Sequence, residues 1–234
     1  MSGLSWTVLV PVKRLLAAKT RLRGAVPDVP HEQLVLALAR DTVLATLRCP
    51  AVGRVVVVTN DPTAQAATAA LGAVVLPDAP DAGLNQALAY GATTVRSRLN
   101  GSDTPGVAAI AADLPALRPD DLSAALRAAA ELATVPARAA RRAFVTDTAG
   151  TGTVLLAAPP GVPLQPSFGA GSAAAPAAGG AVAVEGPLVS LRRDVDTAGD
   201  LAEAAALGVG PHTSALLTGV GYRVDDRTAS FDRS

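Results

Sequence analysis

Residues 107–115 read VAAIAADLP and join a buried strand to the polar residue that follows it. The segment 107–112 is short, apolar and uncharged, as strands covered on both faces of a sheet are. Asp113 comes directly after it, and Pro115 stiffens the chain beyond. Because ligands of parallel α/β sheets bind outside the carboxyl ends of the strands, Asp113 is a candidate active-site residue. Its structural alternative is a cap on the next turn.

The same pattern recurs along the chain, with short β-branched runs that alternate with longer helical periodicities. Strands are predicted at 7–12, 54–59, 73–76, 107–112, 143–147, 153–158 and 181–184. Helices are predicted at 31–48, from Pro62, at 84–99, at 119–132 and at 197–207. This alternation predicts a single-domain α/β fold with a mostly parallel central sheet flanked by helices. We expect one domain over 1–222, a long irregular loop over 157–180 and a disordered tail at 223–234.

Composition narrows the class of protein. Half of the 234 residues are hydrophobic but only 3% are aromatic, so Val, Leu and Ala must fill the core. A formal net charge of zero disfavours a nucleic-acid partner, and no apolar run is long enough to span a membrane. With Cys49 as the one cysteine no intramolecular disulfide can form, which favours a cytoplasmic location. The two histidines, His31 and His212, are expected on the surface.

A basic cluster follows the first predicted strand. Five cations fall within eleven positions, at Lys13, Arg14, Lys19, Arg21 and Arg23. A loop of this kind after the first strand can offset the charge of a nucleoside triphosphate, although a solvated surface loop is the plain alternative. The chain has neither a GxxxxGK[ST] nor a GxGxxG motif, which disfavours a P-loop NTPase and a Rossmann dehydrogenase.

Two further segments offer polar groups for a ligand. In 193–197, Asp196 or Thr197 is expected to cap the following helix, which leaves Asp194 free to bind Mg²⁺ together with Asp113. The segments 150–153 and 168–172 are rich in Gly, Ser and Thr and could hold a small phosphorylated acid. Asn85, at the start of a predicted helix, could hydrogen-bond the base or ribose of a nucleotide, or could be an ordinary polar residue of the first turn.

Taken in order, these motifs resemble the guanylyltransferases of coenzyme F420 biosynthesis, which comprise 2-phospho-L-lactate and phosphoenolpyruvate guanylyltransferases. The resemblance covers about residues 7–210. The motifs that carry it are Pro11-Val12-Lys13, Ala18-Lys19-Thr20-Arg21-Leu22, Val58-Thr59-Asn60-Asp61, Gly83-Leu84-Asn85-Gln86-Ala87-Leu88, Ala112-Asp113-Leu114-Pro115-Ala116-Leu117, Gly150-Thr151-Gly152-Thr153, Phe168-Gly169-Ala170-Gly171-Ser172 and Leu191-Arg192-Arg193-Asp194-Val195-Asp196-Thr197.

The resemblance implies a GT-A-like nucleotidyltransferase fold that uses GTP and Mg²⁺ and releases pyrophosphate. It places the metal on Asp113 and Asp194. It places the phosphorylated acid, expected to be phosphoenolpyruvate, on Thr153, Gly169 and Ser172.

The resemblance also implies that the basic loop faces the nucleotide, with Lys13, Lys19 and Arg21 in binding and catalysis. One position departs from the pattern, since Pro176 stands where these enzymes usually have a histidine. The expected partners are GTP and the acid, with a homodimer and a hand-over of product to the next enzyme of F420 biosynthesis.

The alternatives are of two kinds. The acceptor could instead be 2-phospho-L-lactate or 3-phosphoglycerate, which differ from phosphoenolpyruvate by a few atoms. Outside this activity, Asp194-Val195-Asp196 matches the DxD metal motif of glycosyltransferases, and an inactive nucleotide-binding protein is a third interpretation.

Overall fold

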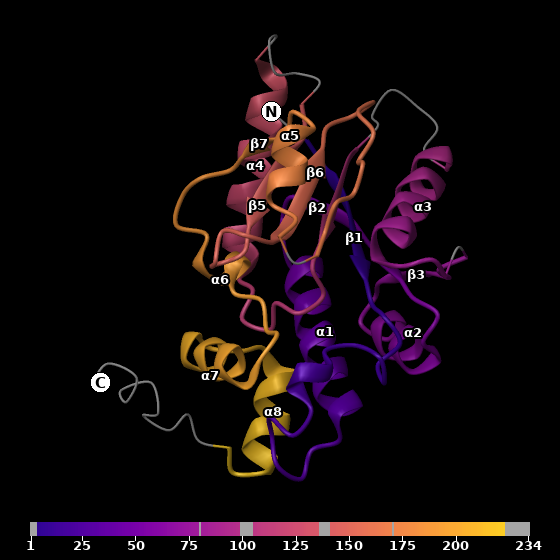
Figure 1. Cartoon of the computed structure of the whole chain (residues 1–234). Helices are drawn as coiled ribbons and strands as arrows, with labels where there is room; N and C mark the ends of the chain where they lie inside the picture. The colour runs from indigo at the N-terminus through magenta and orange to yellow at the C-terminus, as the bar shows by residue number, and fades with distance from the viewer. Residues whose placement is uncertain (1–3, 80, 99–104, 136–140, 170, 223–234) are drawn as a thin grey trace.

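A computed structural model describes residues 4–79, 81–98, 105–135, 141–169 and 171–222, so the predicted tail at 223–234 lies outside the described residues. Within these ranges seven strands form one sheet in the order β3-β2-β1-β4-β6-β5-β7 (Figure 1). Only β6 runs antiparallel to its neighbours. The strands are β1 Trp6–Pro11, β2 Val52–Val58, β3 Val74–Leu76, β4 Gly106–Ile110, β5 Ala143–Thr146, β6 Thr153–Ala158 and β7 Val182–Ala183.

Helices cover both faces of this sheet. The helical elements are η1 Thr20–Leu22, α1 His31–Leu47, α2 Pro62–Ala69, α3 Leu84–Ser97, α4 Pro119–Thr134, α5 Ala174–Ala178, α6 Val189–Arg192, α7 Ala198–Leu207 and α8 Pro211–Gly219. Residues of α1, α2 and α4 pack with one set of strand side chains, whereas α3 and the segment 159–168 pack with the alternate set. The strands can be apolar on both faces for this reason, as the sequence predicts.

The strand order creates a crevice at one edge of the sheet. β1 lies between β2 and β4. After β1 the chain continues to β2, toward the β3 edge of the sheet, and after β4 it continues to β5, toward the β7 edge. In open α/β sheets such a switch point is where ligands bind. Because β6 is antiparallel, its first residue, Thr153, lies at the same edge as the last residues of β1, β4 and β5.

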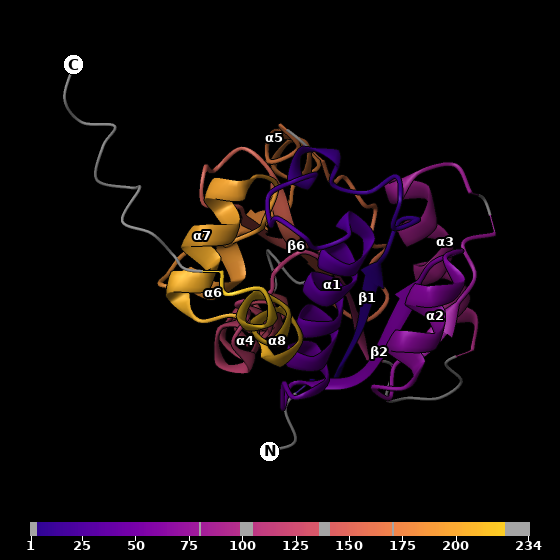
Figure 2. The same ribbon diagram turned by 90° about the horizontal axis from the view of Figure 1, so that it is seen from below.

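A separate apolar cluster joins the C-terminal helices to the rest. This cluster buries Leu22 of η1, Leu38 of α1, Leu201 of α7 and Val195, which precedes α7. Figures 1 and 2 show α7 and α8 beside α1, at the end of the molecule where the loop after β1 also lies. The elements that carry the basic loop and the Asp194 segment are therefore packed against one another.

A buried carboxylate links α1 to α8. Asp41 of α1 is only 2% exposed, and it accepts hydrogen bonds from the backbone N–H groups of His212 and Thr213 at 2.9 and 2.8 Å. It caps the first turn of α8, whose N–H groups have no partner within their own helix. Gly210 makes this approach possible, since a Cβ there would lie 2.5 Å from the Asp41 carboxylate.

The predicted architecture is confirmed, with differences at the ends of elements. Asp61 caps α2, as predicted, by accepting from the N–H groups of Thr63 and Ala64. The predicted strand 181–184 is reduced to two residues, and the expected loop at 157–180 contains the short helix α5. Helices α6 and α8 are not predicted; each has fewer than ten residues and is held by side chains distant in sequence, such as Asp121, which accepts from Ser190, and Asp41. No helix in the described ranges is long and apolar enough to cross a membrane.

The Asp41 cap provides a test of the packing of α8. Asp41→Ala should lower the free energy of unfolding by about 1–3 kcal/mol, because two backbone donors then lose a buried acceptor. Glu131→Ala, which removes an exposed carboxylate from α4, is the matched control and should change stability by less than about 0.5 kcal/mol. Urea unfolding followed by circular dichroism measures both, and equal stability of the two variants would refute the role assigned to Asp41.

Candidate active site

A cavity of about 500 Å³ opens at the switch point. It is lined by the loops that follow β1, β4 and β5, by the start of β6, and by the segments around Phe168 and Asp194. The cavity brings together most of the site residues predicted from sequence, which are Lys13, Lys19, Arg21, Asp113, Thr153, Gly169 and Asp194. Their convergence from distant parts of the chain makes this cavity the candidate active site.

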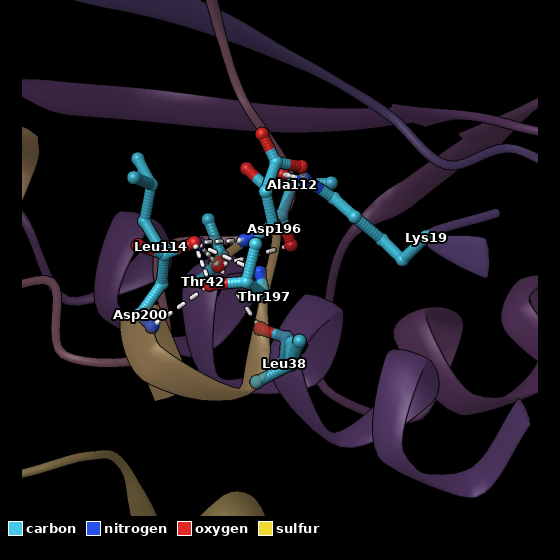
Figure 3. Close-up of polar contacts among 9 residues, drawn as sticks. Lys19, Leu38, Thr42, Ala112, Leu114, Asp196, Thr197 and Asp200 are labelled. Atoms are coloured by element: carbon cyan, nitrogen blue, oxygen red, sulfur yellow. Dashed lines mark hydrogen bonds and ion pairs between the residues drawn. The ribbon is translucent and has the colours of Figure 1, made fainter. Parts of the chain in front are cut away.

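Asp113 is held in place by the backbone on either side of it. The Thr42 hydroxyl of α1 lies 3.1 Å from the carbonyl oxygen of Ala112 and accepts from the N–H of Leu114 at 2.9 Å (Figure 3). The carbonyl oxygen of Asp113 accepts from the N–H of Val195 at 3.0 Å. This last bond fixes the segment with Asp194 and Asp196 against the loop after β4, although about 80 residues separate the two along the chain.

The segment 194–197 is ordered by the start of α7. Thr197 is the N-cap, and its side chain and that of Asp200 form a reciprocal capping box, as the sequence predicts. Asp200 also accepts from the N–H of Asp196 at 3.1 Å. Since Thr197 does the capping, the carboxylates of both Asp194 and Asp196 remain available to face the cavity.

Lys19 lies among these carboxylates. Its ammonium group forms ion pairs with Asp113 and with Asp196, and Figure 3 shows its side chain extended toward Asp196. Burial alone would lower the pKa of Lys19, but attraction to Asp113 and hydrogen bonds to Asp113 and Asp196 raise it above its ordinary value. Lys19 also adopts a left-handed backbone conformation, with φ 50°, which is uncommon outside glycine and turns its side chain into the site.

The carboxylates repel one another. Burial, together with repulsion from Asp113 and Asp196, raises the pKa of Asp194 to about 7, despite the opposing effect of Lys19. Asp113 has an unsatisfied acceptor as well: its Oδ1 atom is buried and has no hydrogen-bond partner among the described residues. A further cation placed here would offset the repulsion among the carboxylates and would give the Oδ1 atom of Asp113 a partner.

The residues present fit a divalent metal that shares its coordination with a substrate. Within the described part of the chain, no group of three or more His, Cys, Asp and Glu side chains is arranged to hold a metal ion by itself. Mg²⁺ is commonly bound by one or two carboxylates, with substrate phosphates and water supplying the remaining oxygen ligands. Asp113 and Asp194 can supply such a pair.

The basic loop is tethered on both sides. Asp61 accepts from the N–H of Leu15 at 3.0 Å, and His31 contacts the carbonyl oxygen of Ala18 at 2.6 Å. The expectation that His31 is a surface residue is therefore wrong: it is half-buried at the start of α1 and holds the loop. His212 is likewise half-buried, and it lies in the first turn of α8.

Lys13 and Arg21 line the cavity, and within the described ranges neither forms an ion pair. Their charges are therefore not offset by a neighbouring carboxylate, in contrast to that of Lys19. Two unpaired cations on the wall of one cavity suit an anionic ligand with more than one charge.

Of the residues predicted for the phosphorylated acid, Thr153 and Gly169 line the cavity, whereas Ser172 is not among its lining residues but contacts Thr153. The Ser172 hydroxyl hydrogen-bonds that of Thr153 at 3.1 Å, and both residues are buried. The two loops are joined again by the N–H of Ala173, which donates to the carbonyl oxygen of Thr151 at 2.9 Å. Gly169 lines the cavity with φ 125°, a conformation that favours glycine.

Pro176 lies in α5, near these residues in the sequence. It is buried, and its carbonyl oxygen accepts from the N–H of Ala181 at 2.9 Å. In the first turn of a helix a backbone N–H is not needed, so proline is tolerated there. A proline side chain supplies no hydrogen-bond donor, in contrast to the histidine that the resemblance implies at this position.

Asp147 is a cavity residue that was not predicted from the sequence. It follows β5, lines the cavity, and accepts from the N–H groups of Thr151 and Gly152 at 2.9 and 2.8 Å. A Cβ at position 152 would lie 2.4 Å from its Oδ2 atom, so the turn requires glycine there. The one available signal was its place at the end of a predicted strand, which Asp113 shares.

Asn85 is directed toward the backbone of Phe168. Its side-chain NH₂ donates to the Phe168 carbonyl oxygen at 3.1 Å, and its Oδ1 accepts from the Phe168 N–H at 2.7 Å. Leu84 and Phe168 line the cavity. The contact of Asn85 with a nucleotide stays a prediction.

The fold and this cavity define a class of protein, and comparison with known families gives the same one. The chain belongs to the MobA-like NTP transferase domain family, which matches residues 31–202. Two solved structures share the fold. A nucleotidyl transferase from Methanothermobacter thermautotroptrophicus has a TM-score of 0.59 at 19% identity, with 88% of this chain and 98% of that chain covered. A 4-diphosphocytidyl-2C-methyl-D-erythritol synthase has a TM-score of 0.55 at 14% identity, with 88% and 99% covered.

Within that family the chain groups with proteins named phosphoenolpyruvate guanylyltransferase, which confirms the resemblance drawn from its motifs. It is 58% identical over 214 residues to the one from Salinispora arenicola, covering 92% of this chain and 94% of that protein. It is 53% identical over 221 residues to the one from Geodermatophilus obscurus, covering 92% and 95%. For the one from Streptomyces coelicolor the identity is 50% over 214 residues, covering 91% and 96%.

The raised pKa of Asp194 predicts a pH-dependent penalty on stability. A carboxyl group with a pKa of 3.8 when unfolded and about 7 when folded is protonated only in the folded state between these values, so stability should fall as pH rises from 4 to beyond 7. Asp194→Asn removes the charge. Without divalent metal it should raise the melting temperature at pH 8 by roughly 2–4 °C, the shift expected for about 1 kcal/mol in a chain of this size.

At pH 5 the gain should be smaller than at pH 8, because the penalty begins above the unfolded pKa of 3.8 and has then only partly developed. Asp28→Asn, in an exposed turn, controls for the loss of one negative charge. Differential scanning calorimetry at both pH values, with a chelator present, makes the measurement. An equal gain at pH 5 and pH 8 would show that charge on Asp194 is not the cause.

The contact between Asp147 and Gly152 gives a second test. Gly152→Ala places a methyl group against the Asp147 carboxylate, so the turn must shift and stability should fall by about 1–3 kcal/mol. Gly199→Ala is the matched control, since a Cβ in the first turn of α7 would meet only Thr197 Oγ1 at 3.6 Å. That change should be neutral or slightly stabilising. Chemical denaturation compares the two, and a neutral Gly152→Ala would contradict the tight turn.

Proposed function

We propose that this protein transfers the guanylyl group of GTP to phosphoenolpyruvate and releases pyrophosphate, as a step of coenzyme F420 biosynthesis in the cytoplasm. The observation that carries the proposal is the meeting of Asp113 and Asp194 at one cavity, with Lys13, Lys19 and Arg21 on its wall. The names of its relatives at 50–58% identity support guanylyl transfer and favour phosphoenolpyruvate over 2-phospho-L-lactate and 3-phosphoglycerate.

In the proposed reaction, a phosphate oxygen of phosphoenolpyruvate attacks the α-phosphorus of GTP. A new phosphorus–oxygen bond forms, and the bond from the α-phosphorus to the bridging oxygen of the β-phosphate breaks. Pyrophosphate leaves with that electron pair. The attacking phosphate is already anionic at neutral pH, so the step needs no general base, and rate enhancement depends on positioning and on offset of charge.

The chain's own residues account for both requirements. Lys13 and Arg21, which are free of ion pairs among the described residues, would bind the triphosphate. Lys19 would exchange its contact with Asp113 for phosphate oxygens when substrate enters. Thr153, Ser172 and the backbone at Gly169 would orient the acid on the opposite wall.

Nucleotidyltransferases generally use a divalent metal with the nucleotide, and we propose Mg²⁺ on Asp113 and Asp194. When bound, it would supply positive charge to the phosphate oxygens. The buried Oδ1 of Asp113 and the crowded carboxylate of Asp194 support this choice. Asp196, which contacts Lys19, would keep that side chain near the phosphates.

Membership of an NTP transferase family favours nucleotidyl transfer over the DxD glycosyltransferase alternative. A pyrophosphate-release assay with GTP, Mg²⁺ and each acid in turn, followed by mass spectrometry of the product, separates these activities. The proposal expects pyrophosphate and a guanosine-diphospho conjugate of enolpyruvate. Turnover of GDP-sugars in place of GTP, or nucleotide binding without pyrophosphate, would overturn it. A homodimer and hand-over of the product to the next enzyme stay predictions, the first measurable by light scattering.

The metal assignment has its own test. Asp113→Asn should lower kcat/KM by roughly 10²-fold or more, because the charge stabilisation at stake is worth several kcal/mol. Asp120→Asn, in the exposed first turn of α4, keeps the same chemical change away from the cavity and should leave kcat/KM within about twofold. Steady-state kinetics with Mg²⁺ measures both. Full turnover by Asp113→Asn would show that Asp113 does not hold the metal.

A further inference from the structure

The side-chain amide of Asn85 is fully engaged in hydrogen bonds to the backbone next to the proposed acid subsite. Both functional groups of its amide bond the backbone of a single residue, Phe168, at 3.1 and 2.7 Å. An amide side chain with its carbonyl oxygen and an N–H used in this way acts much like a neighbouring strand, because it satisfies the donor and the acceptor of one peptide position. Eighty-three residues separate the two along the chain.

Phe168 stands at the start of the loop that forms the proposed acid subsite. Gly169 follows it and lines the cavity, and the carbonyl oxygen of Gly169 accepts from the N–H of Ser172 at 3.1 Å. Ser172 in turn bonds the Thr153 hydroxyl. A continuous path of hydrogen bonds and covalent chain therefore leads from Asn85 to Ser172 and Thr153.

The loop depends on such an external support. Its backbone has positive φ at both Gly169 (125°) and Gly171 (70°), and glycine in these positions leaves the chain conformationally free. The stretch 159–169 that precedes it holds no helix or strand. The contact made by Asn85 fixes Phe168 to the first turn of α3, a rigid element packed on the sheet.

We propose that Asn85 is a positioning residue for the acceptor acid, acting through Phe168 and Gly169, and does not read the nucleotide. The inference rests on the proposed function, since it assigns a residue to one of the two proposed substrates. Removal of the Asn85 amide should let Phe168 and Gly169 shift, so that affinity for the acid falls while the nucleotide side of the cavity is unchanged. A displacement of about 1 Å is enough to reduce turnover strongly.

The test uses Asn85→Asp, which keeps an oxygen to accept from the Phe168 N–H but replaces the NH₂ donor by an oxygen that faces the Phe168 carbonyl. With saturating GTP and Mg²⁺, the KM for phosphoenolpyruvate should rise by roughly 10-fold or more. With saturating phosphoenolpyruvate, the KM for GTP should stay within about twofold of wild type. Asn85→Ala should show the same split.

Thr93→Ala is the matched control, since Thr93 lies on the exposed side of the same helix and its hydroxyl donates only to the Ala89 carbonyl oxygen at 2.9 Å. It should leave both KM values unchanged. Isothermal titration calorimetry with GTP alone adds a readout that needs no turnover. The affinity for GTP should be the same in wild type and Asn85→Asp.

The outcomes are distinct. A rise in the KM for GTP, or weaker GTP binding, with an unchanged KM for phosphoenolpyruvate would overturn the inference and assign Asn85 to the nucleotide. Loss of the folded state in both variants would also overturn it, because Asn85 would then stabilise the fold as a whole. If wild type itself released no pyrophosphate with phosphoenolpyruvate, the proposed function would fail, which is a different result.

Discussion

The hydrogen bond from the N–H of Val195 to the carbonyl oxygen of Asp113 is the contact on which the candidate site depends. It brings two acidic segments to one edge of the sheet. Val195 is fully buried in the cluster formed by η1, α1, α7 and α8, so the bond is shielded from water and its geometry is maintained by packing. The side chains of Asp113, Asp194 and Asp196 lie close together because this bond holds the backbone of their two segments side by side.

The carboxylates of Asp113, Asp194 and Asp196 repel one another, and a bound cation would offset that repulsion. Burial, together with the nearby charges of Asp113 and Asp196, disfavours the charged form of Asp194 and raises its pKa. Lys19 offsets part of that cost in the absence of ligand. The stability of the sheet and helices compensates for the part of the cost that Lys19 does not offset.

Much of the fold and part of the site are visible in the sequence. Strands such as 153–158 were predictable because an apolar run on both faces has few alternatives, and Asp113 because it ends such a run. The N-cap of α7 was predictable because a capping box is local in sequence. What was missed depends on distant partners: Asp147 supports a turn through backbone N–H groups, and Asp41 caps a helix 170 residues further on. No local pattern marks such contacts.

The single reversed strand has a consequence for how this enzyme class diversifies. β6 starts where the parallel strands end, so the hairpin turn between β5 and β6 reaches the crevice separately from the loops after β1 and β4. A change in the length or sequence of this turn can therefore alter one part of the cavity lining while β1, β4 and the loops that follow them stay as they are.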